Sequence, residues 1–127
     1  MAGCAPRRPV GEEIWRFDGN PKDARWIPLA GVLSRSSIIA SPVFADGRVF
    51  IAMGQSPGHG NTPSFVYAIN PNGQGDVTEQ APGLRVRSAA WWGTPIVKDG
   101  LLYVGDLGGT IHCLDAATGA APVEARN

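Results

Sequence analysis

The chain has 127 residues, and its 17 glycines and 11 prolines leave little room for long helices. With 43% hydrophobic and 17% charged residues, the composition is typical of a folded β-rich domain rather than of a disordered chain. Eleven basic residues balance eleven acidic ones, so the charge does not favour nucleic acid or an anionic membrane surface as a partner.

The first segment, residues 1–13, is expected to be a flexible N-terminus. Its Ala-Gly-Cys string at Cys4 is similar to a lipoprotein processing site, but no charged leader and apolar stretch precede it. We interpret the string as a chance occurrence without an intact signal peptide; the alternative is a start that omits one. No apolar run approaches the roughly 18 residues of a membrane-spanning helix, so no transmembrane segment is expected.

Two short stretches, residues 14–17 and 84–87, alternate apolar and polar side chains as edge strands do. Each precedes a longer apolar segment with a hairpin signal. We expect each stretch to be the outer strand of one unit, which would complete a four-stranded set in each case.

Two β-hairpins are predicted from Asp-Gly pairs between apolar runs, because a type I′ turn needs positive φ at both central positions. The pairs are Asp46-Gly47 and Asp99-Gly100. In the strands that follow, residues 49–52 and 101–104, consecutive side chains are apolar, so both faces of these strands are expected to be covered. Small sheets stacked on one another explain this pattern better than a hairpin with one solvent-exposed face.

The two hairpins belong to an internal repeat. Residues 41–54 align without gaps with residues 94–107, and residues 65–73 align with residues 110–119. The matched pairs are Pro42 and Pro95, Asp46 and Asp99, Gly47 and Gly100, and Asn70 and Asp115. The first unit carries an insertion within residues 55–64, which is expected to be a surface loop.

The repeat resembles the pyrroloquinoline-quinone (PQQ) type of β-propeller repeat, whose family includes quinoprotein alcohol dehydrogenases and an outer-membrane-assembly lipoprotein. The resemblance runs from about Ile14 to Gly119. It is carried by residues 41–52 and 94–105, where Ser-Pro or Thr-Pro leads into an apolar strand and Asp-Gly. The string IHCLDAATG at 111–119 is similar to the ending of a family repeat.

This resemblance implies an all-β fold of β-propeller blades, each a four-stranded antiparallel sheet. At about 40 to 50 residues per blade, the chain holds about two to two and a half blades, too few for a closed ring. The PQQ-like repeats are placed at 14–119, with a first full unit at about 38–76, a second at about 84–119 and a truncated tail at 120–127. We therefore interpret the chain as a fragment, whose partners are the remainder of a longer propeller chain or other protein subunits.

Enzymes of this family resemble one another in a PQQ site at the centre of the complete ring, built from a tryptophan floor, a vicinal Cys-Cys disulfide and calcium-ligating acidic residues. This sequence has no vicinal cysteine pair. Trp91 and Trp92 are candidates for a stacking surface, although packing in the core or between blades is the favoured role. PQQ with calcium is therefore expected only in a complete propeller, and no catalytic residue is assigned.

Residues 54–60 form a glycine-rich string, with Ser56 and His59, that imitates the nucleophile elbow of a hydrolase. The elbow must enter a helix so that the next backbone N–H can join an oxyanion hole. Pro57 lacks that N–H, and the surrounding glycines do not favour a helix. A hydrolase is therefore not expected, and Ser56 and His59 are kept as candidates for a binding loop.

Asn70, Asn72 and Asp76 imitate the start of a calcium-binding loop. The glutamate required at the twelfth position is Ala81 and no flanking helices are predicted, so an Asn-Gly turn is the simpler interpretation. His112 is interpreted as a satisfied strand residue, because no pair of ligands stands near it at zinc-like spacing. No metal site is expected.

The leading hypothesis is a non-catalytic PQQ-like repeat segment that acts as a scaffold or binding surface in a bacterial envelope-associated protein. The resemblance implies a periplasmic or cell-envelope location, and we do not expect the chain alone to be an enzyme. The alternative is a part of a PQQ-dependent quinoprotein dehydrogenase whose cofactor site is completed by sequence absent here. A third hypothesis is glycan binding by residues 54–63 and exposed tryptophans.

Overall fold

The computed structural model describes residues 10–20, 22–23, 35–54, 64–80, 83–88 and 93–120. The elements are β1 (Trp15–Arg16), β2 (Val43–Ala45), β3 (Arg48–Met53), β4 (Ser64–Ile69), β5 (Gly75–Asp76), the 3₁₀ turn η1 (Thr78–Gln80), β6 (Gly83–Ser88), β7 (Ile96–Lys98), β8 (Leu101–Gly105) and β9 (Ile111–Asp115). The prediction of an all-β fold is confirmed. In these described ranges no helix has the length and apolar character needed to cross a membrane.

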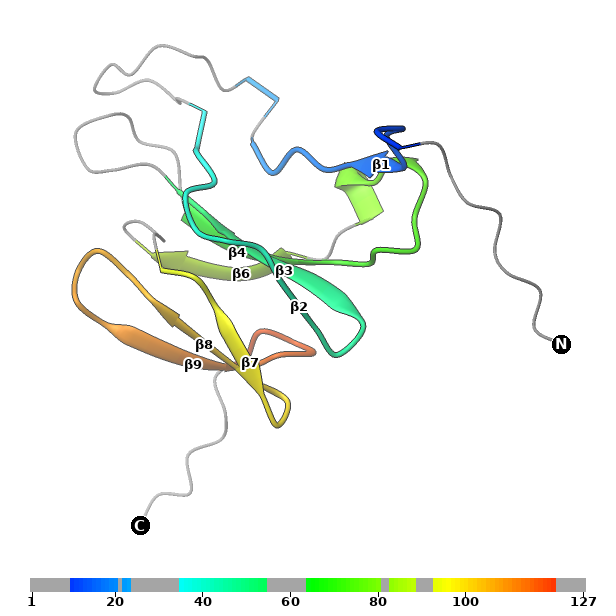
Figure 1. The fold of residues 1–127 in the computed structure, drawn as a ribbon. Coiled ribbons are helices and arrows are strands. Elements are labelled where there is room, and N and C mark those ends of the chain that lie inside the picture. Colours follow the sequence, from blue (N-terminus) through cyan, green and yellow to red (C-terminus); the bar gives the residue numbers. More distant parts are fainter. Residues whose placement is uncertain are drawn as a thin grey trace, which may run out of the picture.

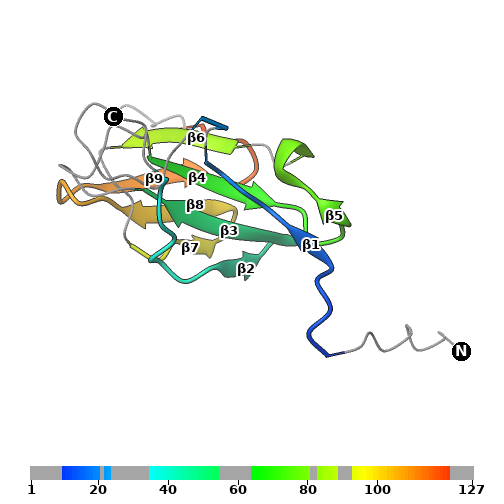
Figure 2. The same ribbon diagram turned by 90° about the horizontal axis from the view of Figure 1, so that it is seen from above.

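The strands form two stacked antiparallel sheets and one short parallel pair (Figure 1). The first sheet has the order β2-β3-β4-β6, and the second has the order β7-β8-β9. The parallel pair joins β1 to β5. Seen from above, β7, β8 and β9 lie under the first sheet as a separate layer (Figure 2). Over the described residues the sheets do not close into a ring.

Both predicted hairpin turns are confirmed. Asp46 and Gly47 have φ values of 50° and 72°, and Asp99 and Gly100 have φ values of 52° and 75°. The flanking strands pair in the same register in both hairpins, because the residues directly before and after each Asp-Gly pair face each other. The two copies of the repeat therefore fold into the same local structure.

The main core lies between the two sheets. The first sheet contributes Phe50, Ala52, Val66 and Ala68 from alternate positions of β3 and β4, and the second contributes Leu102, Val104 and Leu114. Ala45 and Val97 pack at the border of this core. Near it, the backbone N–H of Ser41 donates to the Thr94 hydroxyl over 3.2 Å, which ties equivalent positions of the two repeats together.

The other face of the first sheet is covered by the N-terminal segment. Ile51, Met53 and Ile69 form a second core there with Val77, and Trp15, Phe17, Val49 and Tyr67 pack against it. The Tyr67 hydroxyl donates to the carbonyl of Gly19 over 3.0 Å. A Cβ at Gly19 would stand 2.5 Å from the Met53 sulfur, so the close approach of this segment requires glycine.

Two predictions about outer strands are wrong. The strand predicted at 84–87 is β6, and it pairs with β4, so it is the fourth strand of the first sheet rather than the outer strand of the second. The strand predicted at 14–17 is β1, which pairs in parallel with β5 outside both larger sheets. Edge-like alternation is a local property, whereas the choice of a neighbouring strand depends on the whole chain.

The prediction that both faces of residues 49–52 and 101–104 are covered holds for the first strand alone. Phe50 and Ala52 pack on the second sheet, while Ile51 packs under the N-terminal segment. In β8, Leu102 and Val104 are buried but Tyr103 is exposed. The second sheet is packed on one face only, because among the described residues no layer lies on its other face.

Gly100→Val should destabilise the second hairpin, because a β-branched residue is strained at the φ of 75° that Gly100 adopts. We expect the free energy of unfolding in urea to be about 1–3 kcal/mol lower for Gly100→Val than for Gly100→Asn, because asparagine adopts a positive φ more readily than valine. Equal stability of the two variants would contradict the assignment of the turn.

Candidate functional site

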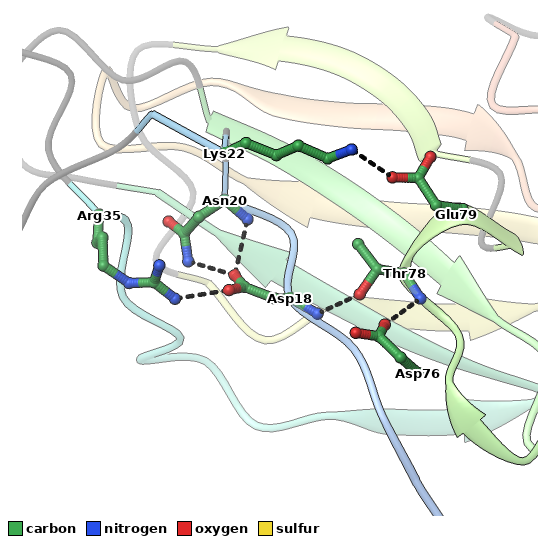
Figure 3. Close-up of a pocket in the computed structure, with 7 residues that line it drawn as sticks. All are labelled: Asp18, Asn20, Lys22, Arg35, Asp76, Thr78 and Glu79. Atoms are coloured by element: carbon green, nitrogen blue, oxygen red, sulfur yellow. Dashed lines mark hydrogen bonds and ion pairs between the residues drawn. The ribbon is translucent and has the colours of Figure 1, made fainter.

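A polar cleft of about 480 Å³ lies where the N-terminal segment meets the turn that follows β5 (Figure 3). Its lining consists of Asp18, Asn20, Lys22, Arg35, Asp76, Thr78 and Glu79. The first three follow β1, the last three belong to β5 and η1, and Arg35 lies shortly before the bridge from Ser37 to Gly54. Segments far apart in the sequence therefore meet in this cleft.

Asp18 is the centre of the hydrogen-bond network in the cleft. Its carboxylate accepts a 2.7 Å bond from the Arg35 guanidinium and a 2.8 Å bond from the Asn20 side-chain amide. The backbone N–H of Asp18 donates to the Thr78 hydroxyl over 3.0 Å. Partial burial alone would raise the pKa of Asp18, but the bonds from Arg35 and Asn20 outweigh it and lower the pKa.

The second carboxylate, Asp76, is held by the turn that it begins. Thr78 donates its backbone N–H to Asp76 over 3.0 Å, and hydrogen bonds from the Thr78 hydroxyl and N–H lower the pKa of Asp76. The Arg16 guanidinium lies 3.7 Å from the same carboxylate. Thr78 thus accepts the backbone N–H of Asp18 on its hydroxyl and donates its own backbone N–H to Asp76, which links the two segments.

Each carboxylate of the cleft has a cation nearby: Arg35 for Asp18, Lys22 for Glu79, and Arg16, from outside the lining, for Asp76. Asp18 pairs with Arg35, and Lys22 lies 3.4 Å from Glu79 at a fully solvated position, where an ion pair contributes little. Because the pKa values of Asp18 and Asp76 are lowered, both stay ionised near neutral pH and cannot act as general acids there. Chemically, the network is suited to clamping the N-terminal segment onto the first sheet.

A second hollow of about 490 Å³ adjoins the cleft and shares Asp18, Asn20 and Arg35 with it. The Asn20 side-chain oxygen accepts the backbone N–H of Ser36 over 2.6 Å. The Ser36 hydroxyl is buried and has no hydrogen-bond partner among the described residues. One serine oxygen does not define a ligand, so this hollow adds space to the cleft without adding chemistry.

The calcium candidates are not brought together. Asp76 lines the cleft, but Asn70 and Asn72 do not; the Asn70 side chain accepts the backbone N–H of Asn72 over 3.0 Å, as in an Asx turn. In the described ranges no group of three or more histidine, cysteine or acidic residues could hold a metal ion. Trp91, Trp92, Ser56 and His59 lie outside the described residues.

The repeat residues serve turns and packing. The Asp115 carboxylate accepts the backbone N–H groups of Ala117 and Thr118 over 2.8 and 3.0 Å, and these bonds lower the pKa of Asp115. Gly119 adopts a φ of 74° in the same turn. The aligned prolines differ, because Pro95 is buried whereas Pro42 is exposed.

The interpretation of His112 as a satisfied strand residue is confirmed. Its Nε2 lies 2.8 Å from a carboxylate oxygen of Asp106, whose side chain is 10% exposed. The other oxygen of Asp106 accepts the backbone N–H of Thr110 over 3.0 Å. This pair stabilises the loop between β8 and β9, and Asp106 was not singled out by the sequence.

The residues that make the cleft were likewise not predicted. A weak signal exists in Asp18-Gly19-Asn20, a turn-like string directly after a strand-like stretch. Arg35 and Thr78 carry no comparable signal, because their roles arise from contacts with Asp18 across the fold.

Asp18→Asn should remove the charge of the central carboxylate and weaken its bond to Arg35. The folded-state pKa of Asp18 lies below the ordinary value of 3.8. The ionised carboxylate therefore contributes to the free energy of unfolding above pH 3.8, and this contribution is lost as the pH falls through the folded-state pKa. Urea unfolding should show wild type more stable near about pH 6, by roughly 0.5–1 kcal/mol, with the gap closing near about pH 2.

The matched control is Glu12→Gln, since Glu12 is exposed and has no ion pair with a described residue. It should follow the wild-type profile throughout. A gap between Asp18→Asn and wild type that stays constant across the acid range would contradict the assigned role of the carboxylate.

No family model matches the chain, and no solved structure matches it.

Proposed function

We propose that this chain is a PQQ-like β-propeller repeat segment that acts as a non-catalytic scaffold or binding surface in a bacterial envelope-associated protein. The propeller family and the envelope location come from the resemblance of the repeat sequence. The observation that carries the proposal is that the two copies of the repeat build two antiparallel sheets packed face to face around a common core. A stack of this kind binds partners through its outer faces and edges.

Support comes from how the two sheets share their core. Leu102 and Val66 are both fully buried, and each belongs to a cluster that contains residues of both sheets. In repeat architectures, stability is the sum of weak single units and strong contacts between neighbours. The two sheets are therefore expected to behave as one structural unit.

The polar cleft also supports a structural role. Its ion pairs and hydrogen bonds connect the N-terminal segment to η1 and to Arg35, and both aspartates in its network have lowered pKa values. Residues arranged for proton transfer at neutral pH would instead have pKa values shifted toward that pH. The cleft thus contributes a rigid joint to the scaffold.

Leu102→Ala should disturb both sheets, because Leu102 is fully buried between them. We expect the free energy of unfolding to fall by about 2–5 kcal/mol. Amide hydrogen exchange should accelerate in β3 and β4 as well as in β8 and β9. Ile111→Ala is the control, since Ile111 is 78% exposed and its truncation should change little. Faster exchange confined to residues 93–120 would argue against a single scaffold unit.

A titration with PQQ and Ca²⁺ separates the scaffold from the dehydrogenase alternative. The full chain should show no saturable quenching of tryptophan fluorescence at micromolar PQQ. A free tryptophan derivative in the same titration corrects for light absorbed by the quinone. Saturable micromolar quenching that depends on calcium would defeat the non-catalytic proposal and support a cofactor-binding part of a dehydrogenase.

A further inference from the structure

One face of the second sheet is apolar and exposed. Ile111 is 78% exposed, Ile96 63% and Tyr103 38%. The register pairs Ile96 with Tyr103, Tyr103 with Cys113, and Gly105 with Ile111, so these five residues share one face, which we term the open face. Exposed apolar side chains gathered on one sheet face are common where a protein binds a partner.

The open face repeats the face through which the first sheet packs. The aligned pairs are Phe50 and Tyr103, Ala52 and Gly105, Val66 and Ile111, and Ala68 and Cys113. The pairs keep an aromatic, a small, a β-branched and a small residue, respectively. The first member of every pair is buried in the core between the sheets, whereas none of the second members is buried. The open face therefore carries the same kinds of residues as the face through which the first sheet packs on the second.

The occupied interface shows what such a face accepts. Leu102, Val104 and Leu114, on the opposite side of the second sheet, pack against the aromatic and small residues of the first sheet. Two different faces meet in this contact, so the contact is heterologous. The same pairing of faces can therefore add one sheet after another along a single direction. The chemistry that fits the open face is thus an aliphatic sheet face like that of Leu102, Val104 and Leu114.

One aligned position differs in polarity. Lys98 stands where Ala45 stands in the first sheet, and it lies on the edge strand β7. A lysine stem can cover apolar surface while its ammonium stays at the rim. The ammonium of Lys98 therefore need not be buried when a second apolar sheet covers this face.

We propose that the open face binds a third sheet of the same repeat type, which contributes an aliphatic face in the manner of Leu102, Val104 and Leu114. This inference rests on the proposed function and specifies the partner and direction of binding. The stack extends from the second sheet, because the N-terminal segment with Trp15 and Phe17 already covers the outer face of the first.

A second copy of the chain does not supply the matching face. Its own Leu102, Val104 and Leu114 are buried against its first sheet, and the equivalent face of that first sheet lies under Trp15 and Phe17. Within the described part of the chain, the uncovered apolar sheet face of a copy is another open face, in which Tyr103 and Ile111 would meet the same residues instead of aliphatic ones. The observations therefore favour a further repeat sheet.

The test supplies such a sheet by extending the full chain at its C-terminus with a second copy of residues 71–120. Both the extended and the unextended chain carry Cys4→Ser, and the added copy carries Cys113→Ala, so that Cys113 of the open face is the one thiol labelled. We expect Cys113 to react at least about tenfold more slowly with a thiol reagent in the extended chain. Urea unfolding of the extended chain should remain a single transition.

The matched control makes Leu102→Ser and Leu114→Ser in the added copy only. This removes the aliphatic face, and the labelling rate of Cys113 should return to within about twofold of the unextended chain. Ile111→Asp in the original second sheet should restore labelling in the same way. Equal labelling rates of Cys113 in the extended chain and in the control with the two serine substitutions would overturn the proposal. This holds also if the added copy does not fold against the open face.

A second result would overturn it differently. If light scattering shows the unextended chain to be a dimer and Cys113 is already protected in it, a second copy covers the open face. Failure of the proposed function is seen separately, as calcium-dependent PQQ quenching or as independent unfolding of the two sheets. The two failures are therefore distinguishable.

Discussion

The packing of one repeat sheet on the next is the interaction on which the rest of the structure depends. Alanines at 52 and 68 leave room on the first sheet, and Leu102, Val104 and Leu114 fill it from the second. Neither the four-stranded nor the three-stranded sheet could bury these apolar side chains alone, because a small sheet needs a second layer to cover its apolar face. The contact also fixes which face of each sheet is buried, and therefore which faces remain for the N-terminal segment and for solvent.

The same contact leaves the two sheets in different surroundings. The first sheet is covered on both faces, by the second sheet and by the N-terminal segment, whereas the second sheet is packed on one. The cleft holds this covering segment in place through Asp18, Arg35 and Thr78, and Gly19 permits its close approach to Met53. The polar network and the apolar cover thus perform one task, which is to close one end of the stack.

How much the sequence could predict depends on how local each feature is. The hairpin turns were predictable, because Asp46-Gly47 and Asp99-Gly100 determine their own backbone conformation. The membership of β6 and the pairing of β1 were not, since alternation indicates a strand but not its neighbour. The cleft could not be predicted from the sequence for the same reason, because Asp18 bonds to Arg35 and Thr78, which lie 17 and 60 positions away in the chain.

One failed prediction carries information of its own. Residues 101–104 have apolar side chains toward both faces, and this pattern predicts cover that the described structure provides on one side only. A contiguous apolar patch on an exposed sheet face is a liability for aggregation unless a partner covers it. Tyr103 and Ile111 have the same residue character, aromatic and β-branched, as the buried Phe50 and Val66 with which they align. Because the aligned residues of the first sheet are buried in a sheet-to-sheet contact, the pattern on the second sheet is that of an interface rather than of a solvent-facing surface.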